Sequence, residues 1–498
     1  MGLTGTLLPT LGAHLAHSPF KRCIFLLVDG ARADVMQSLI QNGELPNLKR
    51  YLLDAGSYRT AVSVFPSTTG PAHAPFLTGC TPGTCNIPGI RWFDREQPQG
   101  WTHFRQSRSY VGPGSLYMDV DLDPAVKTIF EYFERPAGVF SFLNRGLGLF
   151  ENETLLTKSW YWFYAHYTDN WQVVDNAVWP YIRRALDRDA DFIFAVLPAV
   201  DEYSHHSHPF SDLTFESYRA IDRAFGQLAE HLRRQHKLDD TLFVLSSDHG
   251  LSATHTHFEL WEFLNKCGLN TLYYPKILRN GCTAASMISG NGMSNVYLKK
   301  DKGWDIRPTY QEIRNGQYGG TDLISALTQQ DAVDVVATRN GDDGIVVSSR
   351  SGTAEIREVD GMIEYRATEG EPLGYPPMIP RMTPDESLEL TFDTDYPDAP
   401  YQLLKLFAST RTGDMTVSAR PGYDLRMRHE NPEHKSSHGS LHRDHMHVPL
   451  LINAEIGKPF VRTTDVFASM LELMGREAPD AVDGQSFVSH IGAEGVTV

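Results

Sequence analysis

The sequence contains little cysteine and little positive charge, and both shortages narrow the classes of protein it can represent. Its 498 residues include five cysteines, an odd number without the spacing of a zinc knuckle, which favours a reducing compartment over a disulfide framework. Lys and Arg number 45 against 61 Asp and Glu, so the formal net charge is −16. A surface of that sign repels a phosphate backbone, and we therefore expect no nucleic-acid binding.

Long hydrophobic runs are also missing. No stretch approaches the ~18 uninterrupted apolar residues of a membrane helix, so we expect no membrane span. The N-terminal segment lacks the basic start and the apolar centre of a secretion signal, and its opening, MGLTGT, matches the N-myristoylation pattern only formally. We expect an ordinary flexible terminus and a cytoplasmic protein. Cys80 and Cys85 could still bridge a tight loop if the chain were exported.

The sequence does contain apolar runs that end in acidic residues. Residues 23–30 (CIFLLVDG) place Asp29 after such a run, and a run that starts near Phe192 precedes Asp201. A third run, which starts near Leu242, precedes Asp248 and His249. Each pattern is typical of a buried parallel strand that delivers its acidic residue to the carboxyl end.

A helical pattern separates the second and third of these runs. Its apolar residues recur at helical spacing from Phe215 to Leu232, behind a cap at Ser211 or Asp212. Strand, helix and strand in this order indicate a right-handed crossover in a parallel sheet. We therefore predict an α/β fold with a mostly parallel central sheet flanked by helices. A late strand near Val448 and a helix over residues 464–473 return to this architecture.

The pattern of apolar and polar residues changes in the middle of the chain. Alternating stretches such as residues 344–367 predict antiparallel strands, and no long apolar run there ends in an acidic residue. We predict a core catalytic domain in two parts, residues 1–260 and 431–498, with a smaller α+β cap domain inserted over residues 261–430. A second, aromatic-rich insertion near residues 95–175 could wall a substrate pocket.

The acidic strand ends predict a metal site. Loops at the carboxyl ends of strands form the ligand crevice of an open α/β sheet, so Asp29, Asp201 with His205, and Asp248 with His249 should converge. Carboxylates gathered without a cation would repel one another, whereas divalent metals bind such mixed oxygen and nitrogen ligands. His438, just before the late strand, completes the set. Asp29 could instead cap the helix that follows it.

Thr69 is the predicted nucleophile. It stands where a loop gives way to a predicted helix, whose first amides would favour a transferred phosphoryl group. Coordination to one metal would lower the pKa of its hydroxyl, and a second metal could stabilise the leaving oxygen. Thr68 is the competing candidate one residue away. His73 is expected to pack or to form a hydrogen bond beneath the loop.

These motifs in this order resemble the alkaline phosphatase superfamily, and more narrowly its nucleotide pyrophosphatase/phosphodiesterase branch. The resemblance rests on VDG at Val28, TGPAH at Thr69, DEYSH at Asp201, DHG at Asp248 and SHG at Ser437. It implies two divalent metal ions, of zinc. It further implies that Asp29, Thr69, Asp248 and His249 hold one ion and that Asp201, His205 and His438 hold the other.

One part of the chain departs from the pattern of this branch. Phosphodiesterases of the branch carry an Asn after the nucleophile, in a stretch that resembles Gly-Ile-x-x-Asn. In this chain the stretch, residues 89–95, reads GIRWFDR and has no Asn at that place. Arg91 or Asn86 could bind the phosphoryl oxygens instead, and a guanidinium can hold two of them at once. An arginine also suits a dianionic monoester, so this departure leaves the preference for diesters open.

The sequence therefore predicts a phosphohydrolase that cleaves a small-molecule phosphate ester, of the phosphodiester or nucleotide pyrophosphate type, through a phosphothreonine on Thr69. A phosphomonoesterase, a phosphonoacetate hydrolase-like enzyme and a phosphoryl-transferring mutase are alternatives on the same site, and a sulfatase is the least favoured. A non-catalytic binding protein on this scaffold is the alternative of another class. Surplus histidines near the motifs should be packed or supporting, with a third metal at His255 and His257 as a minor alternative. The oligomeric state is left open.

Overall fold

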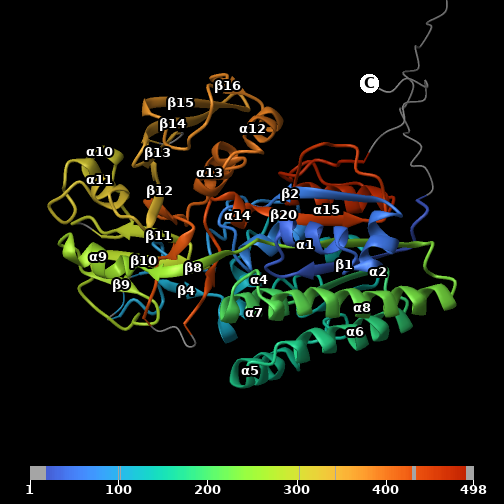
Figure 1. The fold of residues 1–498 in the computed structure, drawn as a ribbon. Coiled ribbons are helices and arrows are strands. Elements are labelled where there is room, and N and C mark those ends of the chain that lie inside the picture. Colours follow the sequence, from blue (N-terminus) through green and yellow to red (C-terminus); the bar gives the residue numbers. More distant parts are fainter. Residues whose placement is uncertain are drawn as a thin grey trace, which may run out of the picture.

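Two β-sheets organise the chain (Figure 1). The computed structural model describes residues 18–98, 100, 102–301, 303–341, 344–428 and 433–488. The expectations for the first residues of the chain concern residues 1–17, which lie outside the described part. Within that part, no helix is long and apolar enough to cross a bilayer. The five cysteines all carry free thiols, Cys80 and Cys85 included.

The first sheet forms the core of the protein and has seven strands. In spatial order they are β21 (Val461–Arg462), β2 (Ser57–Val62), β20 (His447–Ile452), β7 (Thr241–Ser246), β1 (Arg22–Val28), β6 (Phe192–Leu197) and β5 (Pro136–Val139). Strands β5, β6, β1 and β7 are parallel, and β20 is antiparallel to both of its neighbours. The predicted mostly parallel sheet is confirmed, and the three strands that precede the acidic residues are adjacent in it.

Helices flank this sheet as the apolar periodicity predicts. The helix after Ser211 is α8 (Asp212–Arg234), and the hydroxyl of Ser211 caps it by accepting from the amide of Thr214. Figure 1 shows α8 running alongside α6 (Gln172–Asp187) below the sheet. The other helices of the core are α1 (Ala33–Gln41), α3 (Ala74–Thr78), α5 (Lys158–Thr168), α7 (Ala199–Ser207) and α15 (Thr463–Leu473). The α/β class is therefore confirmed, with the late strand and helix in place.

The second sheet is built from residues 271–419 alone and has nine strands. In spatial order they are β16 (Arg381–Met382), β15 (Met362–Gly370), β14 (Gly352–Val359), β13 (Gly344–Ser349), β12 (Val333–Arg339), β17 (Met415–Ala419), β11 (Met293–Leu298), β10 (Ala284–Ser289) and β9 (Thr271–Tyr273). The predicted antiparallel pairing is confirmed except between β9 and β10, which run parallel. These strands support the division into a core and an insertion, which we retain as a proposal.

Smaller elements join the two sheets. Strand β8 (Ser252–His257) pairs with β18 (Gly422–Asp424) on one side and β19 (Ser436–Ser437) on the other, and β3 (Arg91–Phe93) pairs with β4 (Ser107–Ser109). The remaining α-helices are α2 (Pro46–Leu48), α4 (Met118–Asp121), α9 (Leu260–Lys266), α10 (Tyr310–Arg314), α11 (Leu323–Thr328), α12 (Pro384–Thr391), α13 (Ala399–Ala408) and α14 (Arg443–Met446). Strand β8 follows the Asp248 loop, and β19 precedes His438. The pairing of β8 with β19 therefore brings the two parts of the core together beside the insertion.

A buried ion pair fastens the insertion to the core. Arg462, at the start of α15, donates from Nε and Nη2 to the two carboxylate oxygens of Asp398, at 2.7 and 2.8 Å. Asp398 lies at the start of α13 in the insertion and is 0% exposed, and Arg462 is 4% exposed. The side-chain amide of Gln402 also donates to Asp398, at 2.9 Å. Both carboxylate oxygens of Asp398 therefore accept hydrogen bonds where the two parts of the chain meet.

We expect Arg462→Met to lower the free energy of unfolding by about 3 kcal/mol or more, because it leaves the Asp398 carboxylate buried without its cation. Urea unfolding followed by circular dichroism measures this change. Arg366→Met is the matched control, since Arg366 pairs with Glu355 at the surface with 71% of its side chain exposed; its effect should stay within about 0.5 kcal/mol. Adding Asp398→Asn to Arg462→Met should recover part of the loss. A double variant no more stable than Arg462→Met would contradict this account.

Candidate metal centre

Asp29 and Thr69 meet at the carboxyl end of β1. The Thr69 hydroxyl donates to Oδ1 of Asp29 at 3.2 Å, and Thr69 Oγ1 lies 3.1 Å from Nε2 of His249. Asp29 does not cap α1, whose N-cap residue is Arg32. The helix predicted after Thr69 is short: a 3₁₀ turn (Pro71–His73) leads into α3. The hydroxyl of Thr68 is buried without a hydrogen-bond partner among the described residues, so the geometry favours Thr69 over Thr68 as the nucleophile.

Asp248 and His249 reach the same place from the loop after β7. Oδ1 of Asp248 accepts from the amide of Gly30 at 3.3 Å. Nε2 of His249 lies 3.4 Å from Oδ1 of Asp29 and 3.4 Å from Oδ2 of Asp248. Both residues are 0% exposed. The neighbouring strands β1 and β7 therefore bring two carboxylates and an imidazole into contact, as predicted, and the loop after β2 adds the Thr69 hydroxyl.

His73 also reaches this group. Its Nε2 lies 3.2 Å from Oδ2 of Asp248, and its ring packs edge-on against Phe142 and Phe194. We expected His73 to pack or to form a hydrogen bond beneath the loop. Its ring packs there, but its ligand atom also lies with those of Asp29 and Asp248 in a group that could hold a metal ion.

Asp201 and His205 lie on α7, one helical turn apart. Nε2 of His205 is 3.5 Å from Oδ2 of Asp201. His438 follows β19, and its ring stacks on that of His249 with centroids 3.7 Å apart and planes 4° apart. Because His249 also contacts Asp29 and Asp248, its ring joins the two halves of the site. The seven predicted metal-ligand residues thus form one continuous cluster.

The main chain fixes which nitrogen each histidine presents. Nδ1 of His205, His249 and His438 lies within hydrogen-bond distance of a carbonyl, those of Ser436, Gly250 and Ser67 respectively, at 2.9, 3.1 and 3.2 Å. A carbonyl only accepts, so each Nδ1 donates to it, and burial, which lowers the pKa of all three rings, favours the form in which Nε2 keeps its lone pair. Histidines that bind metals are oriented in this way. The three rings are therefore held as neutral ligands.

The electrostatics of the site call for cations. Burial raises the pKa of Asp29 and Asp201 well above the usual range, and nearby carboxylates, Asp248 among them, raise both further. Burial lowers the pKa of His205 and His438, so the rings add no positive charge. Oδ1 of Asp201 and Oδ2 of Asp248 are buried without a hydrogen bond from any described residue. These donors fit divalent metal ions, which neutralise clustered carboxylates and bind neutral imidazole.

Two groups bring their ligand atoms within 4.8 Å of one another: Asp201 with His249 and His438, and Asp29 with His73 and Asp248. This grouping divides the cluster differently from the sets implied by the family resemblance, which pair His249 with Asp29 and include His205 and Thr69. The assignment of each ligand to one ion therefore stays a proposal. Among the described residues, neither group includes His255 or His257, and His257 lies between Asp424 and Glu433 at 2.9 Å from each.

The insertion supplies a cradle for His438. The hairpin between β10 and β11 pairs with His438 through three residues: Gly290 accepts from the amide of His438 at 3.0 Å, Gly292 donates to its carbonyl at 2.8 Å, and Asn291 forms the bridge between them. A Cβ on Gly290 would lie 2.5 Å from Nδ1 of His438. The close approach explains the glycine. A predicted metal ligand of the core is thus held by main chain of the insertion.

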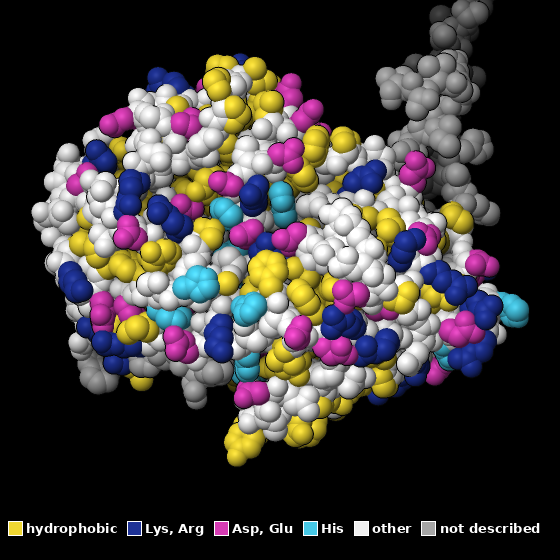
Figure 2. Space-filling model, viewed as in Figure 1, with side chains coloured by type: hydrophobic (Ala, Val, Ile, Leu, Met, Phe, Trp, Pro, Cys, Tyr) yellow, Lys and Arg dark blue, Asp and Glu magenta, His cyan; other side chains and the backbone are white. Residues whose placement is uncertain are grey.

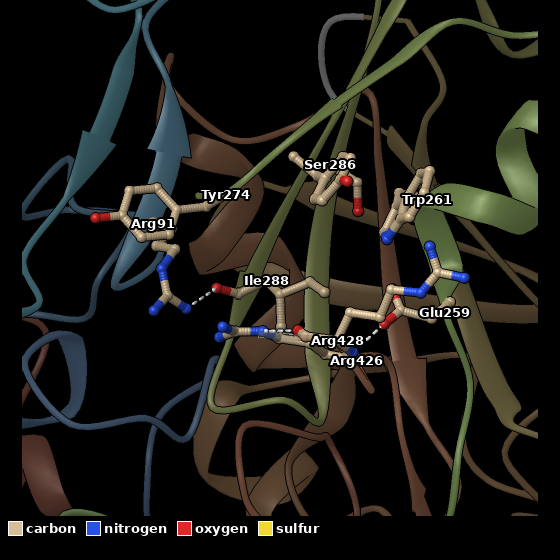
Figure 3. A pocket seen from close by; sticks show the side chains of 9 residues that line it. Arg91, Glu259, Trp261, Tyr274, Ser286, Ile288, Arg426 and Arg428 are labelled. Atoms are coloured by element: carbon tan, nitrogen blue, oxygen red, sulfur yellow. Dashed lines mark hydrogen bonds between the residues drawn. The ribbon is translucent and has the colours of Figure 1, made fainter. Parts of the chain in front are cut away.

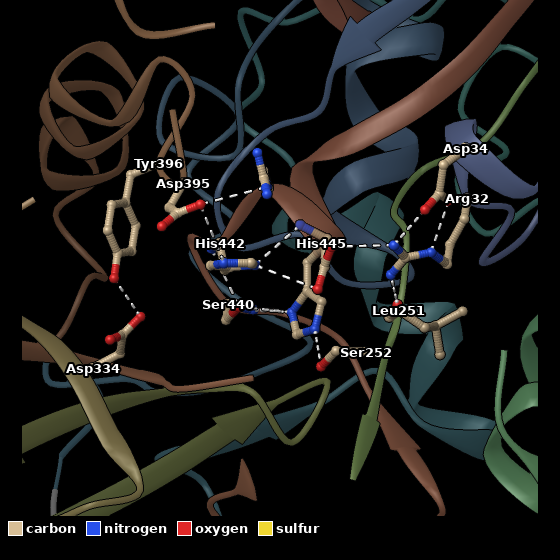
Figure 4. A network of polar contacts seen from close by, with 12 residues as sticks. Arg32, Asp34, Leu251, Ser252, Asp334, Asp395, Tyr396, Ser440, His442 and His445 are labelled. Atoms are coloured by element: carbon tan, nitrogen blue, oxygen red, sulfur yellow. Dashed lines mark hydrogen bonds and ion pairs between the residues drawn. The ribbon is translucent and has the colours of Figure 1, made fainter. Parts of the chain in front are cut away.

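A network of polar side chains surrounds His445, seven residues after His438 in the chain (Figure 4). His445 lies between the hydroxyls of Ser440 and Ser252, with distances of 2.7 and 2.8 Å to its two ring nitrogens. The hydroxyl of Ser67 donates to the carbonyl of Ser440 at 2.8 Å. Figure 2 shows histidine side chains on this face where α14 lies between the two sheets. His445 is one of the surplus histidines expected to play a supporting role, and each of its two ring nitrogens lies within hydrogen-bond distance of a serine hydroxyl.

Arg91 and Asn86, the predicted substrate-binding residues, lie in different surroundings. Arg91 is 8% exposed, donates to the carbonyl of Ile288 at 3.3 Å and lies over the ring of Tyr274, 4.9 Å from its centroid (Figure 3). The amide oxygen of Asn86 accepts from the hydroxyl of Ser409 at 2.6 Å, and its carbonyl accepts from Arg411. Asn86 thus joins the loop to the insertion. Arg91 lines a pocket, which makes it the stronger candidate of the two.

Several residues at this site were not assigned a role from the sequence. Asn291 lies in a hairpin about 150 residues from His438 in the chain, and no local pattern connects the two. Glu202 follows Asp201 directly; burial and then Asp169 raise the pKa of its carboxyl to about 8. The ring of His434 lies 4.4 Å from that of His205. The position of Glu202 inside the DEYSH motif was the one sequence signal that could have identified it.

Comparisons with known proteins agree with this geometry. The family model for type I phosphodiesterase / nucleotide pyrophosphatase matches residues 23–441. Phosphonoacetate hydrolase from Sinorhizobium meliloti 1021, in complex with phosphonoformate, shares the fold with a TM-score of 0.55 and 15% identity over 92% of this chain and 96% of the hydrolase. A mutant of alkaline phosphatase PafA gives a TM-score of 0.56 and 13% identity over 94% and 98% of the two chains.

A curated relative matches only part of the chain. GPI ethanolamine phosphate transferase 1 of Gibberella zeae is 23% identical over 253 residues, which are 48% of this chain and 24% of the transferase. The chain therefore spans about a quarter of the length of this relative.

We expect Gly290→Ala to weaken binding of a titrated zinc ion by about tenfold or more, because the new methyl group displaces the ring of His438. Isothermal titration calorimetry on protein freed of metal measures the affinity. Gly361→Ala is the matched control, since Gly361 also has a positive φ, +73° against +61° for Gly290, and meets nothing within 4 Å. The control should retain wild-type affinity. Equal losses in the two variants would show that backbone strain, and not the cradle, causes the effect.

Proposed function

Because the chain belongs to the type I phosphodiesterase/nucleotide pyrophosphatase family of phosphoester hydrolases, in the alkaline phosphatase superfamily, we propose that it cleaves small-molecule phosphate esters with Thr69 as the nucleophile. One observation carries the proposal: the hydroxyl of Thr69 lies within hydrogen-bond distance of Asp29 and His249, inside a buried cluster of metal-ligand side chains. A non-catalytic protein would have no need to keep a hydroxyl in such a place.

Two divalent metal ions, of zinc, complete the proposed site. Following the family pattern, Asp29, Thr69, Asp248 and His249 would hold one ion, and Asp201, His205 and His438 would hold the other. The ions would supply the positive charge that lowers the pKa of the Thr69 hydroxyl and stabilises the oxygens around phosphorus. The buried carboxylates and imidazoles support divalent metals in general, and such donors tolerate several of them.

The chain's own residues then perform two displacements at phosphorus. Thr69 Oγ1 forms a bond to phosphorus as the bond to the leaving oxygen breaks, and the proton that Oγ1 loses is returned through solvent to the leaving oxygen, which gives a phosphothreonine and an alcohol or phosphate product. A water molecule next attacks the phosphothreonine: its oxygen bonds to phosphorus as the bond to Oγ1 breaks, its proton restores the hydroxyl of Thr69, and inorganic phosphate or a phosphate monoester leaves. Asp29 and His249 position Thr69 Oγ1 for both steps.

The family favours diesters or nucleotide pyrophosphates, and Arg91 bears on that preference. No asparagine stands at the position that carries it in this branch, and the nearby guanidinium of Arg91 can hold two oxygens of a phosphoryl dianion. A phosphomonoester or a phosphonate is therefore the second candidate substrate. Hydrolysis of para-nitrophenyl phosphate, its bis ester and para-nitrophenyl phenylphosphonate under the same conditions separates these classes.

We expect Thr69→Ala to lower kcat by about a thousandfold or more, because the nucleophile is lost. Thr68→Ala is the matched control one residue away and should stay within about tenfold of the wild type, since its hydroxyl lies outside the cluster. Turnover of para-nitrophenyl phosphate and its bis ester measures both. Circular dichroism and zinc content should be unchanged in Thr68→Ala. A fully active Thr69→Ala would reject the assignment, and the reverse pattern would transfer the role to Thr68.

Chelation should abolish turnover, because the buried carboxylates then repel both one another and the anionic substrate. Activity should return on addition of zinc in excess of the chelator. Elemental analysis of the purified protein should give two metal ions per chain. Turnover that persists after the metal content has fallen to zero would rule out a metal-dependent mechanism.

A further inference from the structure

The outward face of α5 carries a row of exposed apolar side chains. Phe163 and Tyr167 are 72% and 82% exposed, and Trp160 is 58% exposed. Leu156, in the turn that leads into the helix, is 92% exposed. Their spacing of four, three and four residues places these four residues, the α5 stripe, on one side of the helix. Figure 2 shows hydrophobic side chains at the lower edge of the molecule, where Figure 1 places α5.

The opposite face of α5 is fixed against the core. Tyr161 and Trp162 pack on Phe140, with ring centroids 5.5 and 5.2 Å apart, and Ala165 is buried. Trp162 also contacts Trp171 edge-on, at 6.0 Å. Apolar residues therefore cover both faces of the helix, whereas a helix at the surface of a monomer normally presents a polar face to water. In the described part of the chain, the α5 stripe is thus a firmly held apolar surface that remains open to solvent.

The rings on this side of α5 are already arranged in stacked pairs. Trp160 stacks on Tyr164 with centroids 5.4 Å apart and planes 15° apart, and Phe163 stacks on Tyr167 at 6.2 Å and 13°. Side chains that are ordered before binding lose less conformational freedom when they bind, and buried aromatic rings supply much of the binding energy of protein interfaces. The α5 stripe is therefore prearranged for contact with another apolar surface.

The absence of charge on this side of α5 bears on the kind of partner. Between Ser159 and Thr168 the sequence has no Lys, Arg, Asp or Glu. Lys158, the one lysine of α5, donates to the carbonyl of Ser141 at 2.9 Å and lies 4.1 Å from the ring centroid of Phe142. A helix that lies on a membrane surface carries Lys and Arg along its polar face, and α5 has no such row. An uncharged protein surface therefore fits the stripe better than a bilayer does.

We propose that the α5 stripe pairs with the α5 stripe of a second copy of this chain, so that the protein forms a two-fold symmetric dimer. With a formal charge of −16, two copies repel each other over most of their surface, and an uncharged apolar face is where they can approach. In a two-fold dimer each copy presents the same face, so the stripe of one copy covers the stripe of the other. The inference goes beyond the proposed function and does not depend on it.

The exposed area is sufficient for a stable dimer. At about 200 Å² for each full side chain, the stripe together with Leu155 and Tyr164 exposes roughly 700 Å². One side of a stable interface of standard size buries ~800 Å², whereas the largest apolar patch of a typical monomer measures ~300–600 Å². Pairing of the two stripes therefore removes from water an area close to that of a standard interface.

Sedimentation velocity on the full-length chain measures this association. The wild type should form dimers with a Kd of about 10 μM or lower, as expected of an interface of this size. Phe163→Glu should raise the Kd about a hundredfold or more, because two carboxylates then face an apolar interface. Leu278→Glu is the matched control, since it adds the same charge at an apolar residue of the insertion that is 71% exposed. Its Kd should stay within about threefold of the wild type.

A mixture of two variants tests whether the partner surface is the same stripe. Phe163→Lys alone should also be monomeric. An equimolar mixture of the Phe163→Glu and Phe163→Lys variants should form dimers again, with a Kd at least about tenfold below that of either variant alone, because opposite charges then meet near the two-fold axis. Circular dichroism and the thermal midpoint of both variants should match those of Leu278→Glu, which excludes misfolding as the cause of the monomers.

Three results would overturn the inference: a wild type that stays monomeric at concentrations well above the expected Kd, a dimer that persists in Phe163→Glu, or a mixture that does not restore dimers. Vesicles of phosphatidylcholine and phosphatidylserine in equal amounts provide a further arm. A monomer that binds these vesicles, and is released from them by Phe163→Glu, would assign the stripe to a bilayer instead of a second copy. None of these measurements uses turnover, so the proposed function is tested separately.

Discussion

The structure depends on the repulsion between carboxylates that the fold buries at the ends of neighbouring strands. Asp29, Asp201 and Asp248 are each less than a tenth exposed, and burial together with their mutual charge raises the pKa of the first two. Such a cluster is stable as a set of anions only when cations bind to it. Nδ1 of each neighbouring histidine donates to a carbonyl, so that Nε2 is the nitrogen directed at the site. The uncharged rings can bind a metal through Nε2 but do not neutralise the carboxylates.

The insertion is a structural part of this site as well as a cover. Main chain of the β10–β11 hairpin fixes His438, and Ile288 of the same hairpin accepts from Arg91. The buried pair of Arg462 and Asp398 holds the insertion on the core. Each contact joins residues more than a hundred positions apart except the last, which spans 64. Movement of the insertion would therefore displace a proposed metal ligand, His438, and a proposed substrate-binding side chain, Arg91, together.

Local chemistry explains how much could be predicted from the sequence. Strand β1 and Asp29 follow from one apolar run, and α8 with its Ser211 cap follows from helical spacing, so the core sheet and the acidic strand ends were predictable. The predicted ligands converge because parallel strands share a carboxyl edge. Asn291 reaches His438 through a tertiary contact between loops, which leaves no periodicity or short motif. Asn86 illustrates the same limit, since its contacts with Ser409 and Arg411 depend on how the insertion docks.

Electrostatics also connects the metal centre to substrate capture. A phosphate ester approaches a chain with a formal charge of −16, and without cations the cluster of carboxylates would repel it further. In the proposed site, bound divalent ions would reverse the sign of the field at Thr69. Metal binding and substrate binding would then be coupled by charge, because the ions that we propose to activate the nucleophile would also attract an anionic substrate to it.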